Sequence, residues 1–227
     1  MSQKMQHPVN RRELASLAAE VATRARLGEV PGDALEGLAV YLELLVRWNA
    51  VFNLVSPGDW REIFTRLAVD SFYLADFLSR LPLPETPQTW DFGAGAGLPG
   101  VPLRLIWTQG EYCMVERREK RAIFLSTVLS ILKLERTCIF RGTVENFFAF
   151  SRRPSGRAHC IVSRAFLPWR ELLDLTRAHL PPDGVLIVFA VKEAPSTLPD
   201  HWTLAGTYAY TVANRHRYFW ALSPSGG

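Results

Sequence analysis

The sequence contains little cysteine and no long apolar run. Only 3 of its 227 residues are cysteines, which excludes a small scaffold held together by disulfides. The longest apolar segment runs from Val185 to Val191 and ends at Lys192, so it is too short to cross a bilayer as a helix. Residues 1–12 are polar and basic without an apolar core, and we therefore expect no signal peptide.

Neither sign of charge dominates the chain. The net charge is +4 and the pI is about 9.1, which excludes a histone-like polycation but permits a polyanionic partner. With 48% apolar and 21% charged residues, the composition is that of a globular protein. Cys113, Cys138 and Cys160 lie in apolar, strand-like segments without metal-ligand spacing. We expect buried, reduced thiols, no metal site and a cytoplasmic location.

A proline-rich segment, residues 81–87, separates two sequence patterns. Before it, apolar residues recur every three or four positions, which is typical of amphipathic helices. The predicted helices span residues 11–27, 35–48 and 63–78. We therefore predict an N-terminal helical extension (1–85) and a second domain (86–227).

After the prolines, strand-like and helical segments alternate. The predicted strands span residues 89–92, 112–115, 138–140, 160–162, 185–191, 204–212 and 218–222. Alternation predicts a parallel sheet with helices on both faces, and the last two strands add an antiparallel hairpin. This α/β arrangement, a seven-stranded and mostly parallel sheet with a C-terminal hairpin, is the Rossmann-like topology of class I methyltransferases.

A glycine-rich segment follows the first predicted strand and opens a helix. Its spaced residues are Asp91, Gly93, Gly95 and Gly97. Glycines here let the backbone turn sharply and approach a ligand at the start of the helix. The spacing also fits a dinucleotide fingerprint, so NAD remains an alternative. Asp91 could accept a hydrogen bond from a ligand ammonium and Glu116 could bind ribose hydroxyls; the acid before the glycines favours S-adenosylmethionine.

Asp91–Leu103 resembles the signature of the bacterial RsmG family, formerly called glucose-inhibited division protein B. The segment reads Asp-Phe-Gly-Ala-Gly-Ala-Gly-Leu-Pro-Gly-Val-Pro-Leu, and Ser163–Phe166 adds Ser-Arg-Ala-Phe. The likeness is clear over residues 41–166. It implies a class I enzyme that transfers a methyl group from S-adenosyl-L-methionine to N7 of a guanine in the 530 loop of 16S ribosomal RNA, leaving S-adenosyl-L-homocysteine.

The resemblance also implies positions for individual residues. Gly93 and Leu98 would line the methionine end of the cofactor, Glu116 and Arg117 the ribose and adenine, and Val144 and Glu145 the adenine. Arg164 would lie beside the methyl donor and the target base, as the catalytic residue.

Three positions depart from the family pattern. Leu67 follows Arg66 where the family has a histidine, Val55 replaces a threonine, and Glu193 replaces a glycine after Lys192. All three lie outside the cofactor loop.

The implied chemistry suits the residues. Guanine N7 carries a lone pair and no proton, so its methylation needs alignment and exclusion of water rather than a general base. The segment Val162–Phe166 lacks the Asp/Asn-Pro-Pro-aromatic motif of many amine methyltransferases. Arg164 could donate hydrogen bonds to guanine O6, and Phe166 could stack on a base.

Basic side chains near the predicted site are candidates for contact with RNA phosphates. They cluster at residues 117–121, 152–157 and 215–217. The full set of RNA-contact candidates is Asn53, Arg66, Arg121, Phe166, Lys192, Arg215 and His216. The expected partner is 16S ribosomal RNA, within the small ribosomal subunit or an assembly intermediate, bound by a monomer without membrane or metal.

Three alternatives remain open from the residues alone. The chain could methylate a small molecule, or use NAD as an oxidoreductase. It could also be a cofactor-binding ribosome-assembly protein without catalytic activity, which the departures at Val55, Leu67 and Glu193 suggest.

Overall fold

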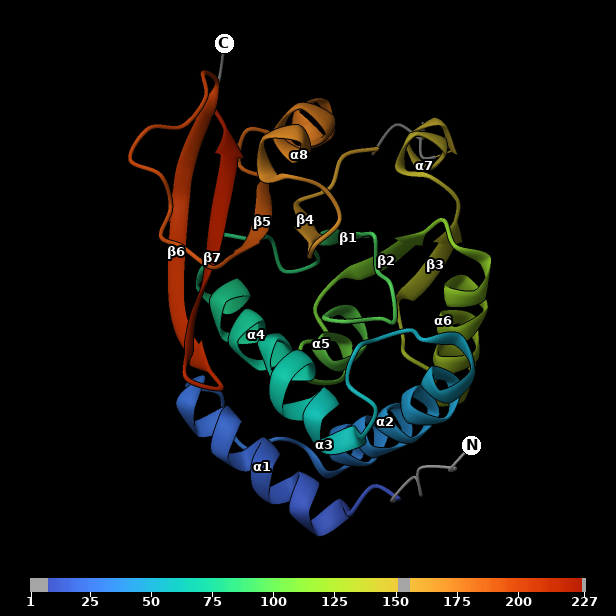
Figure 1. The fold of residues 1–227 in the computed structure, drawn as a ribbon. Coiled ribbons are helices and arrows are strands. Elements are labelled where there is room, and N and C mark those ends of the chain that lie inside the picture. Colours follow the sequence, from blue (N-terminus) through green and yellow to red (C-terminus); the bar gives the residue numbers. More distant parts are fainter. Residues whose placement is uncertain (1–7, 151–155, 226–227) are drawn as a thin grey trace.

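The computed structural model describes residues 8–150 and 156–225 (Figure 1). Its helices are α1 (Arg11–Arg24), α2 (Gly32–Phe52), α3 (Trp60–Ile63), α4 (Asp70–Arg80), α5 (Gly100–Ile106), α6 (Glu119–Leu132), α7 (Val144–Phe150) and α8 (Trp169–Thr176). A π-helical turn spans Phe64–Ala68 and a 3₁₀ turn spans Arg177–His179. The strands are β1 (Gln88–Phe92), β2 (Glu111–Glu116), β3 (Thr137–Arg141), β4 (Cys160–Ser163), β5 (Val185–Ala190), β6 (Trp202–Val212) and β7 (Arg215–Pro224).

The seven strands form one sheet in the order β3-β2-β1-β4-β5-β7-β6. Strands β1 to β5 are parallel, and β7 pairs antiparallel with both β5 and β6. The predicted sheet and hairpin are therefore confirmed. The chain runs from β1 outward to β2 and β3 and then crosses to β4 on the other side of β1. The carboxyl ends of β1 and β4 thus form a topological switch point, where open α/β sheets bind ligands.

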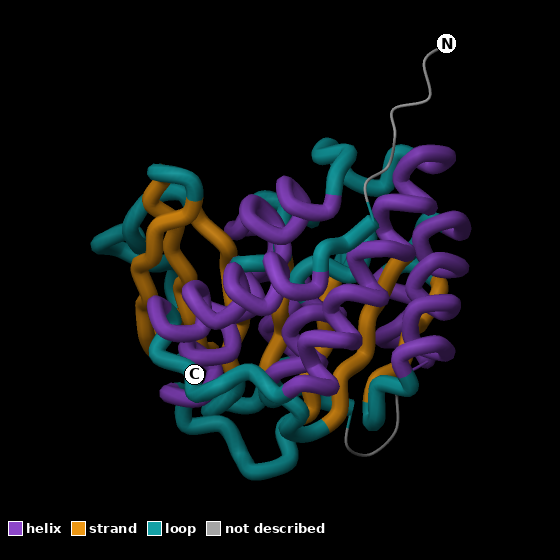
Figure 2. The backbone as a smooth tube through the Cα atoms, turned by 90° about the horizontal axis from the view of Figure 1, so that it is seen from below, coloured by secondary structure: helices purple, strands orange, loops and turns teal. Residues whose placement is uncertain are grey.

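Successive side chains along the strands point to opposite faces of the sheet, and each face carries its own hydrophobic cluster. On β2, Tyr112 and Met114 belong to the larger cluster, with α2, α4, α5 and α6, while Cys113 and Val115 belong to the smaller one beneath α7 and α8. This period of two is that of a strand covered on both faces. The two layers of helices can be followed in Figures 1 and 2.

The N-terminal helices lie on the same face as α5 and α6 and share the larger hydrophobic cluster with the sheet. The predicted domain boundary at residue 85 stays a prediction. Helix α1 ends at Arg24, earlier than predicted, because Arg26 takes a left-handed φ of 56° and the Leu27 amide bonds to the Ala22 carbonyl at 2.9 Å. This is a Schellman-type cap, which here uses an arginine in place of the usual glycine.

The predicted third helix is divided into α3, a π-helical turn and α4. Asp59 caps α3 by accepting the amide of Glu62 at 3.0 Å, and the Val69 amide then bonds to the Phe64 carbonyl at 3.0 Å, five residues back. The wider turn inserts one extra residue. The spacing of apolar residues in the sequence does not reveal this insertion.

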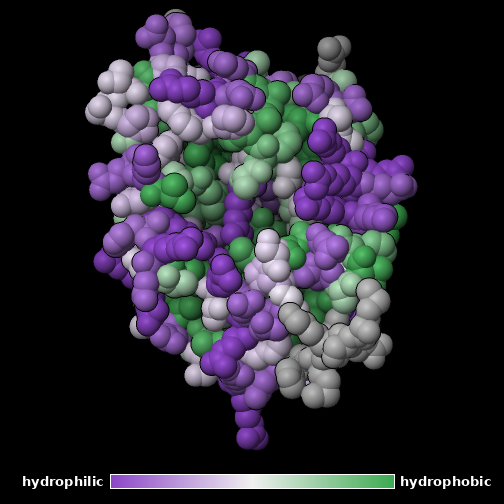
Figure 3. Space-filling model, viewed as in Figure 1, coloured by the Kyte–Doolittle hydropathy of each residue, from purple (hydrophilic) through white to green (hydrophobic). Residues whose placement is uncertain are grey.

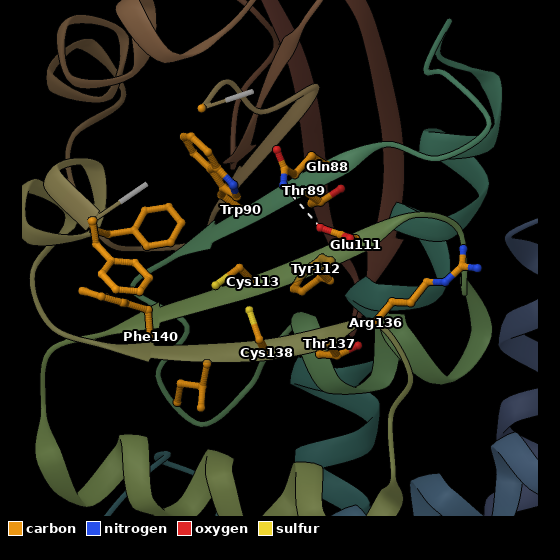
Figure 4. A pocket seen from close by; sticks show the side chains of 14 residues that line it. Gln88, Thr89, Trp90, Glu111, Tyr112, Cys113, Arg136, Thr137, Cys138 and Phe140 are labelled. Atoms are coloured by element: carbon orange, nitrogen blue, oxygen red, sulfur yellow. Dashed lines mark hydrogen bonds between the residues drawn. The ribbon is translucent and has the colours of Figure 1, made fainter. Parts of the chain in front are cut away.

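The cysteine prediction was wrong for Cys138. Cys160 is buried and Cys113 is partly buried, but Cys138 is exposed. Its strand, β3, lies at the edge of the sheet, so an apolar strand segment there is covered less completely than a central one. Cys113 and Cys138 are register partners on β2 and β3, and Figure 4 shows both sulfur atoms facing one cavity.

One buried arginine, Arg104, is held by hydrogen bonds to several backbone carbonyls. Arg104 is 3% exposed and donates to five backbone carbonyls. These are the carbonyls of Trp107, Thr108, Gln109, Gly110 and Glu135.

We expect Arg104→Met to lower the free energy of unfolding by about 3 kcal/mol or more, because buried acceptors would lose charged donors. Urea unfolding measures the change, and exposed Arg47→Met should stay within about 0.5 kcal/mol of wild type. Equal stabilities for the two variants would contradict this account.

Candidate active site

The glycine-rich loop follows β1 at the carboxyl edge of the sheet, at the switch point. Gly93, Gly95 and Gly97 have φ values of 71°, 61° and 84°, a region that other residues adopt only with strain. A Cβ on Gly93 would lie 2.7 Å from the Phe166 ring, and one on Gly97 would lie 2.6 Å from Val101. Two of the predicted glycines are therefore also required by packing.

Gly95 is buried, but unlike Gly93 and Gly97 it has room for a Cβ. The nearest heavy atoms to a Cβ there would be 3.7 Å away, on Arg121 and Gly93. Only its positive φ therefore selects for glycine. A glycine-rich turn that opens a helix fits the cofactor that the loop predicts.

Side chains from distant parts of the chain hold the loop in place. The Glu116 carboxylate accepts the amides of Gly95 at 2.9 Å and Arg118 at 2.7 Å. The buried Tyr41 hydroxyl donates to the Ala96 carbonyl at 2.8 Å. Ser71 donates likewise to the Pro99 carbonyl at 2.9 Å. Helices α2 and α4 of the N-terminal segment therefore help to shape the loop.

A cleft of about 340 Å³ opens beside this loop, within the size range of small-ligand sites. It is lined by Gly93, Val115, Glu116, Arg117, Arg118, Arg121, Gly142, Thr143, Val144, Glu145, Ala165, Phe166 and Leu167. The walls thus combine two carboxylates with arginines and apolar side chains. The space-filling view shows the face with its central hollow and hydrophilic residues around it (Figure 3).

The cleft brings together half of the predicted cofactor residues. Gly93, Glu116, Arg117, Val144 and Glu145 all line it. The prediction missed Gly142 and Thr143, although both follow the end of a parallel strand, where ligands are expected. Glu145 has a lowered pKa because of hydrogen bonds from its own backbone amide and from Thr143. It is therefore held as a carboxylate that can accept hydrogen bonds.

The other five predicted cofactor residues do not line the cleft: they are Asp91, Gly95, Gly97, Leu98 and Arg164. Leu98 is partly exposed and packs against the larger hydrophobic cluster. The Asp91 carboxyl is 1% exposed and accepts a hydrogen bond from the Tyr112 hydroxyl at 3.1 Å. Burial raises the pKa of Asp91 to about 7, with a smaller contribution from Glu116. In this arrangement Asp91 supports the loop from beneath.

Arg164 projects from the loop after β4 toward the N-terminal helices. Its guanidinium lies 3.0 Å from the Asp70 carboxylate and donates to the Leu67 carbonyl at 3.2 Å. The side chain is 19% exposed, and the next residue, Ala165, has a φ of 53° and lines the cleft. The guanidinium is thus fixed at the edge of the site.

The predicted RNA-contact residues divide into two groups. Arg121 and Phe166 line the cleft. Asn53, Arg66, Lys192, Arg215 and His216 do not line it, but all five are exposed. Asn53 ends α2 with a left-handed φ of 49°, and Arg66 pairs with Glu62 at 3.6 Å. Arg152 and Arg153, from the predicted basic clusters, lie outside the described residues.

A second cavity, of about 610 Å³, lies under α7 and is separate in its lining from the cleft (Figure 4). It is lined by aromatic side chains, the two neighbouring cysteines, and Gln88, which bonds to Glu111 at 3.3 Å. None of the predicted cofactor residues lines it. The cavity therefore does not belong to the predicted site.

The sheet order, the glycine loop at its switch point and the adjoining cleft define a class I methyltransferase. The family described as "GidB: rRNA small subunit methyltransferase G" matches residues 34–203. The chain is 46% identical to the Ribosomal RNA small subunit methyltransferase G of Nitratidesulfovibrio vulgaris strain DP4, over 95% of each chain. It is 44% identical to that of Oleidesulfovibrio alaskensis, again over 95% of each. The chain belongs to this family.

A solved structure agrees with the fold. A mutant of MtNAS in complex with S-adenosylmethionine superposes with a TM-score of 0.58 at 11% identity, covering 96% of this chain and 93% of that one. Family membership confirms the predicted methyltransferase class and its cofactor, S-adenosylmethionine. It also removes the NAD alternative.

The described residues contain neither a candidate membrane span nor a candidate metal site. None of the helices in the described part of the chain is both long and apolar enough to span a bilayer. Within residues 8–150 and 156–225, no group of three or more His, Cys, Asp or Glu side chains is placed to hold a metal ion.

The raised pKa of Asp91 predicts a pH-dependent stability. Between about pH 4, near the usual carboxyl value, and about pH 7, the folded protein keeps a proton that the unfolded chain has released. The free energy of unfolding should therefore fall as pH rises through this window. Asp91→Asn cannot ionise, so its stability should fall less than that of wild type between pH 5 and pH 8 in urea unfolding. Exposed Asp174→Asn is the control, expected to follow wild type; parallel curves for Asp91→Asn and wild type would refute the account.

The positive φ of Gly95 and the bond from its amide to Glu116 predict that cofactor binding is sensitive to substitution at this residue. Gly95→Asp would place a side chain where the ligand approaches, on a positive φ, and a carboxylate near Glu116. We expect calorimetry to detect no binding of S-adenosylmethionine. Gly28→Asp makes the same chemical change at an exposed turn with no neighbour within 4 Å and should bind like wild type. Unchanged affinity in Gly95→Asp would exclude the loop as the binding site.

Proposed function

We propose that this protein transfers a methyl group from S-adenosylmethionine to N7 of a guanine in the 530 loop of 16S ribosomal RNA. The observation that carries the proposal is the cleft beside the glycine loop, in a chain 46% identical to relatives named Ribosomal RNA small subunit methyltransferase G. The printed name supports small-subunit ribosomal RNA as the substrate. The N7 position and the 530 loop come from the sequence resemblance and the chemistry of the site.

The cofactor would lie along the loop and into the cleft. Glu116 and Glu145 supply hydrogen-bond acceptors for ribose hydroxyls and adenine-edge donors, and Val144 supplies an apolar contact. Bound S-adenosylmethionine supplies an electrophilic methyl group on a positively charged sulfur. The Glu116 carboxylate would have to exchange its contact with the Gly95 amide, or share it, when ribose hydroxyls arrive.

The target guanine would enter between Arg164 and Phe166. Arg164 is held in one place by Asp70 and the Leu67 carbonyl, so it can offer N–H groups to guanine O6 without first being ordered, which leaves the N7 lone pair free for the methyl group. Phe166 covers Gly93 and can present its ring face to a base. N7 has no proton to lose, so the residues need only align the base with the methyl carbon and exclude water.

At two of the positions that depart from the family pattern, Leu67 and Val55, the residue makes its hydrogen bond through its backbone. Leu67 accepts from Arg164 through its carbonyl, and Val55 donates its amide to the Asn49 side chain at 2.9 Å. Neither contact depends on the side chain that differs. These positions therefore give no reason to prefer an inert binding protein.

The basic side chains around the site would hold the RNA backbone. Arg117, Arg118 and Arg121 line the cleft, and Lys120 is exposed on the same turn, with its ammonium 5.1 Å from the Phe52 ring centroid. Neutralisation of phosphates by such residues makes binding weaken steeply with salt. We infer that the partner is the small subunit or an assembly intermediate of it, in the cytoplasm.

The direct experiment incubates the protein with labelled S-adenosylmethionine and small ribosomal subunits from a strain that lacks the endogenous modification. Borohydride–aniline cleavage then locates 7-methylguanine. We expect label in the RNA and one cleavage, in the 530 loop. Label elsewhere in the RNA would overturn the proposed site, and label confined to small molecules would overturn the RNA substrate.

A substitution tests the role of Arg164. We expect Arg164→Ala to lower kcat about 100-fold, because the base loses its fixed donor, while the dissociation constant for S-adenosylmethionine changes less than about 3-fold. Arg170→Ala removes an exposed arginine six residues further on and should retain wild-type turnover. Equal losses in cofactor affinity and kcat for Arg164→Ala would count against its place at the base.

A further inference from the structure

Asp70 is a buried carboxylate on which three distant segments meet. It begins α4 and its side chain is 2% exposed. Arg217 of β7 donates to its two oxygens at 2.6 and 2.8 Å. The hydroxyl of Tyr210 on β6 donates at 3.0 Å, and Arg164 lies 3.0 Å away. The sheet hairpin, the N-terminal helices and the β4 loop are thereby joined at one group.

The π-helical turn before α4 provides a second set of acceptors for the same arginines. The Leu67 carbonyl receives Arg164 at 3.2 Å, and the Arg66 carbonyl receives Arg217 at 3.1 Å. Arg164 is therefore held at two points of the same short segment, the backbone carbonyl of Leu67 and the side-chain carboxylate of Asp70. A guanidinium fixed in this way loses little entropy when it binds a further acceptor.

The remaining N–H groups of Arg164 make no hydrogen bond to any described residue. Each of its two terminal nitrogens makes one contact, the first with the Leu67 carbonyl and the second with the Asp70 carboxylate. The guanidinium also lies 6.0 Å from the Phe189 ring centroid. Since a guanidinium carries five donors, donors remain for the substrate.

We propose that Asp70 is a positioning residue for methyl transfer: it fixes the Arg164 guanidinium so that its unengaged N–H groups face the target base. The proposal rests on the proposed function, in which Arg164 contacts the guanine. Asp70 also keeps two arginines close together without mutual repulsion, because its negative charge lies between them. Loss of that charge would leave Arg164 free to turn away from Arg217.

The same helix contains a matched control. Asp76 is also a buried carboxylate of α4, with its side chain 7% exposed. Its carboxylate accepts a hydrogen bond from the Nε of Arg80 at 3.1 Å and another from the hydroxyl of Tyr208, on β6, at 2.7 Å. Asp76 thus anchors the hairpin to α4 in the same chemical way, but it does not touch Arg164.

The test compares Asp70→Asn with Asp76→Asn in the subunit methylation assay. We expect Asp70→Asn to lower kcat about 100-fold, the size expected for a misplaced catalytic group. Its dissociation constant for S-adenosylmethionine should stay within about 3-fold of wild type. Asp76→Asn should keep kcat within about 3-fold while losing thermal stability to a similar degree. Similar kcat losses in both variants would show a structural role and overturn the proposal.

A double-mutant cycle separates positioning from other effects. If Asp70 acts through Arg164, then Asp70→Asn should change kcat less than about 3-fold in the Arg164→Ala background. A full 100-fold loss there would overturn the proposal. Should Asp70→Asn not fold, Arg164→Lys serves instead, because a lysine cannot hold both the carboxylate and the Leu67 carbonyl in a planar fork. We then expect the same kcat loss with cofactor affinity kept, and wild-type kcat would contradict it.

These outcomes are distinguishable from failure of the proposed function. If the wild-type protein places no methyl group on small subunits, the proposed substrate is wrong. If wild type is active but Arg164→Ala is too, the role of Arg164 is wrong. An inactive Arg164→Ala together with a fully active Asp70→Asn, like the two overturning outcomes above, removes the inference about Asp70 and leaves the proposed function in place.

Discussion

The site depends on one buried negative charge. A carboxylate removed from water must be paired and hydrogen-bonded to be tolerated, and Asp70 meets this need with Arg164, Arg217 and Tyr210. These partners lie about 90 to 150 residues further along the chain, as their separations in sequence show. The requirement to neutralise Asp70 therefore draws the β4 loop and the C-terminal hairpin onto the start of α4. Arg164, which precedes the cleft residues Ala165 and Phe166, is fixed as a consequence.

The glycine loop depends on the N-terminal helices in the same way. Tyr41 on α2 and Ser71 on α4 each donate to a loop carbonyl, and Glu116 accepts the Gly95 amide from the other side. A loop with three left-handed glycines has many conformations open to it when unfolded, so these bonds select one. The helices before the prolines thus help to fix the conformation of the glycine loop.

Much of the fold could be predicted from the sequence because periodicity reports burial. The seven strands, the hairpin and the loop at the switch point follow from alternation, and half of the predicted cofactor residues lie at strand ends in the cleft. The contacts of Asp70 could not be predicted, because no local pattern tells which arginine a carboxylate will meet. Asp91 precedes the glycines as predicted but faces into the protein beneath them. The exposure of Cys138 depends on its place at the sheet edge, which strand order decides.

The measurement that tests this account most directly is a crystal structure of the protein with S-adenosyl-L-homocysteine. We predict the adenosine against Glu116 and Val144, the amino-acid end along Gly93–Gly97, and the sulfur at the side of the cleft that Arg164 borders, with the pair between Arg164 and Asp70 intact. Ligand bound in the cavity between β1, β2 and β3, or an Arg164 released from Asp70 and turned away from the cleft, would contradict it.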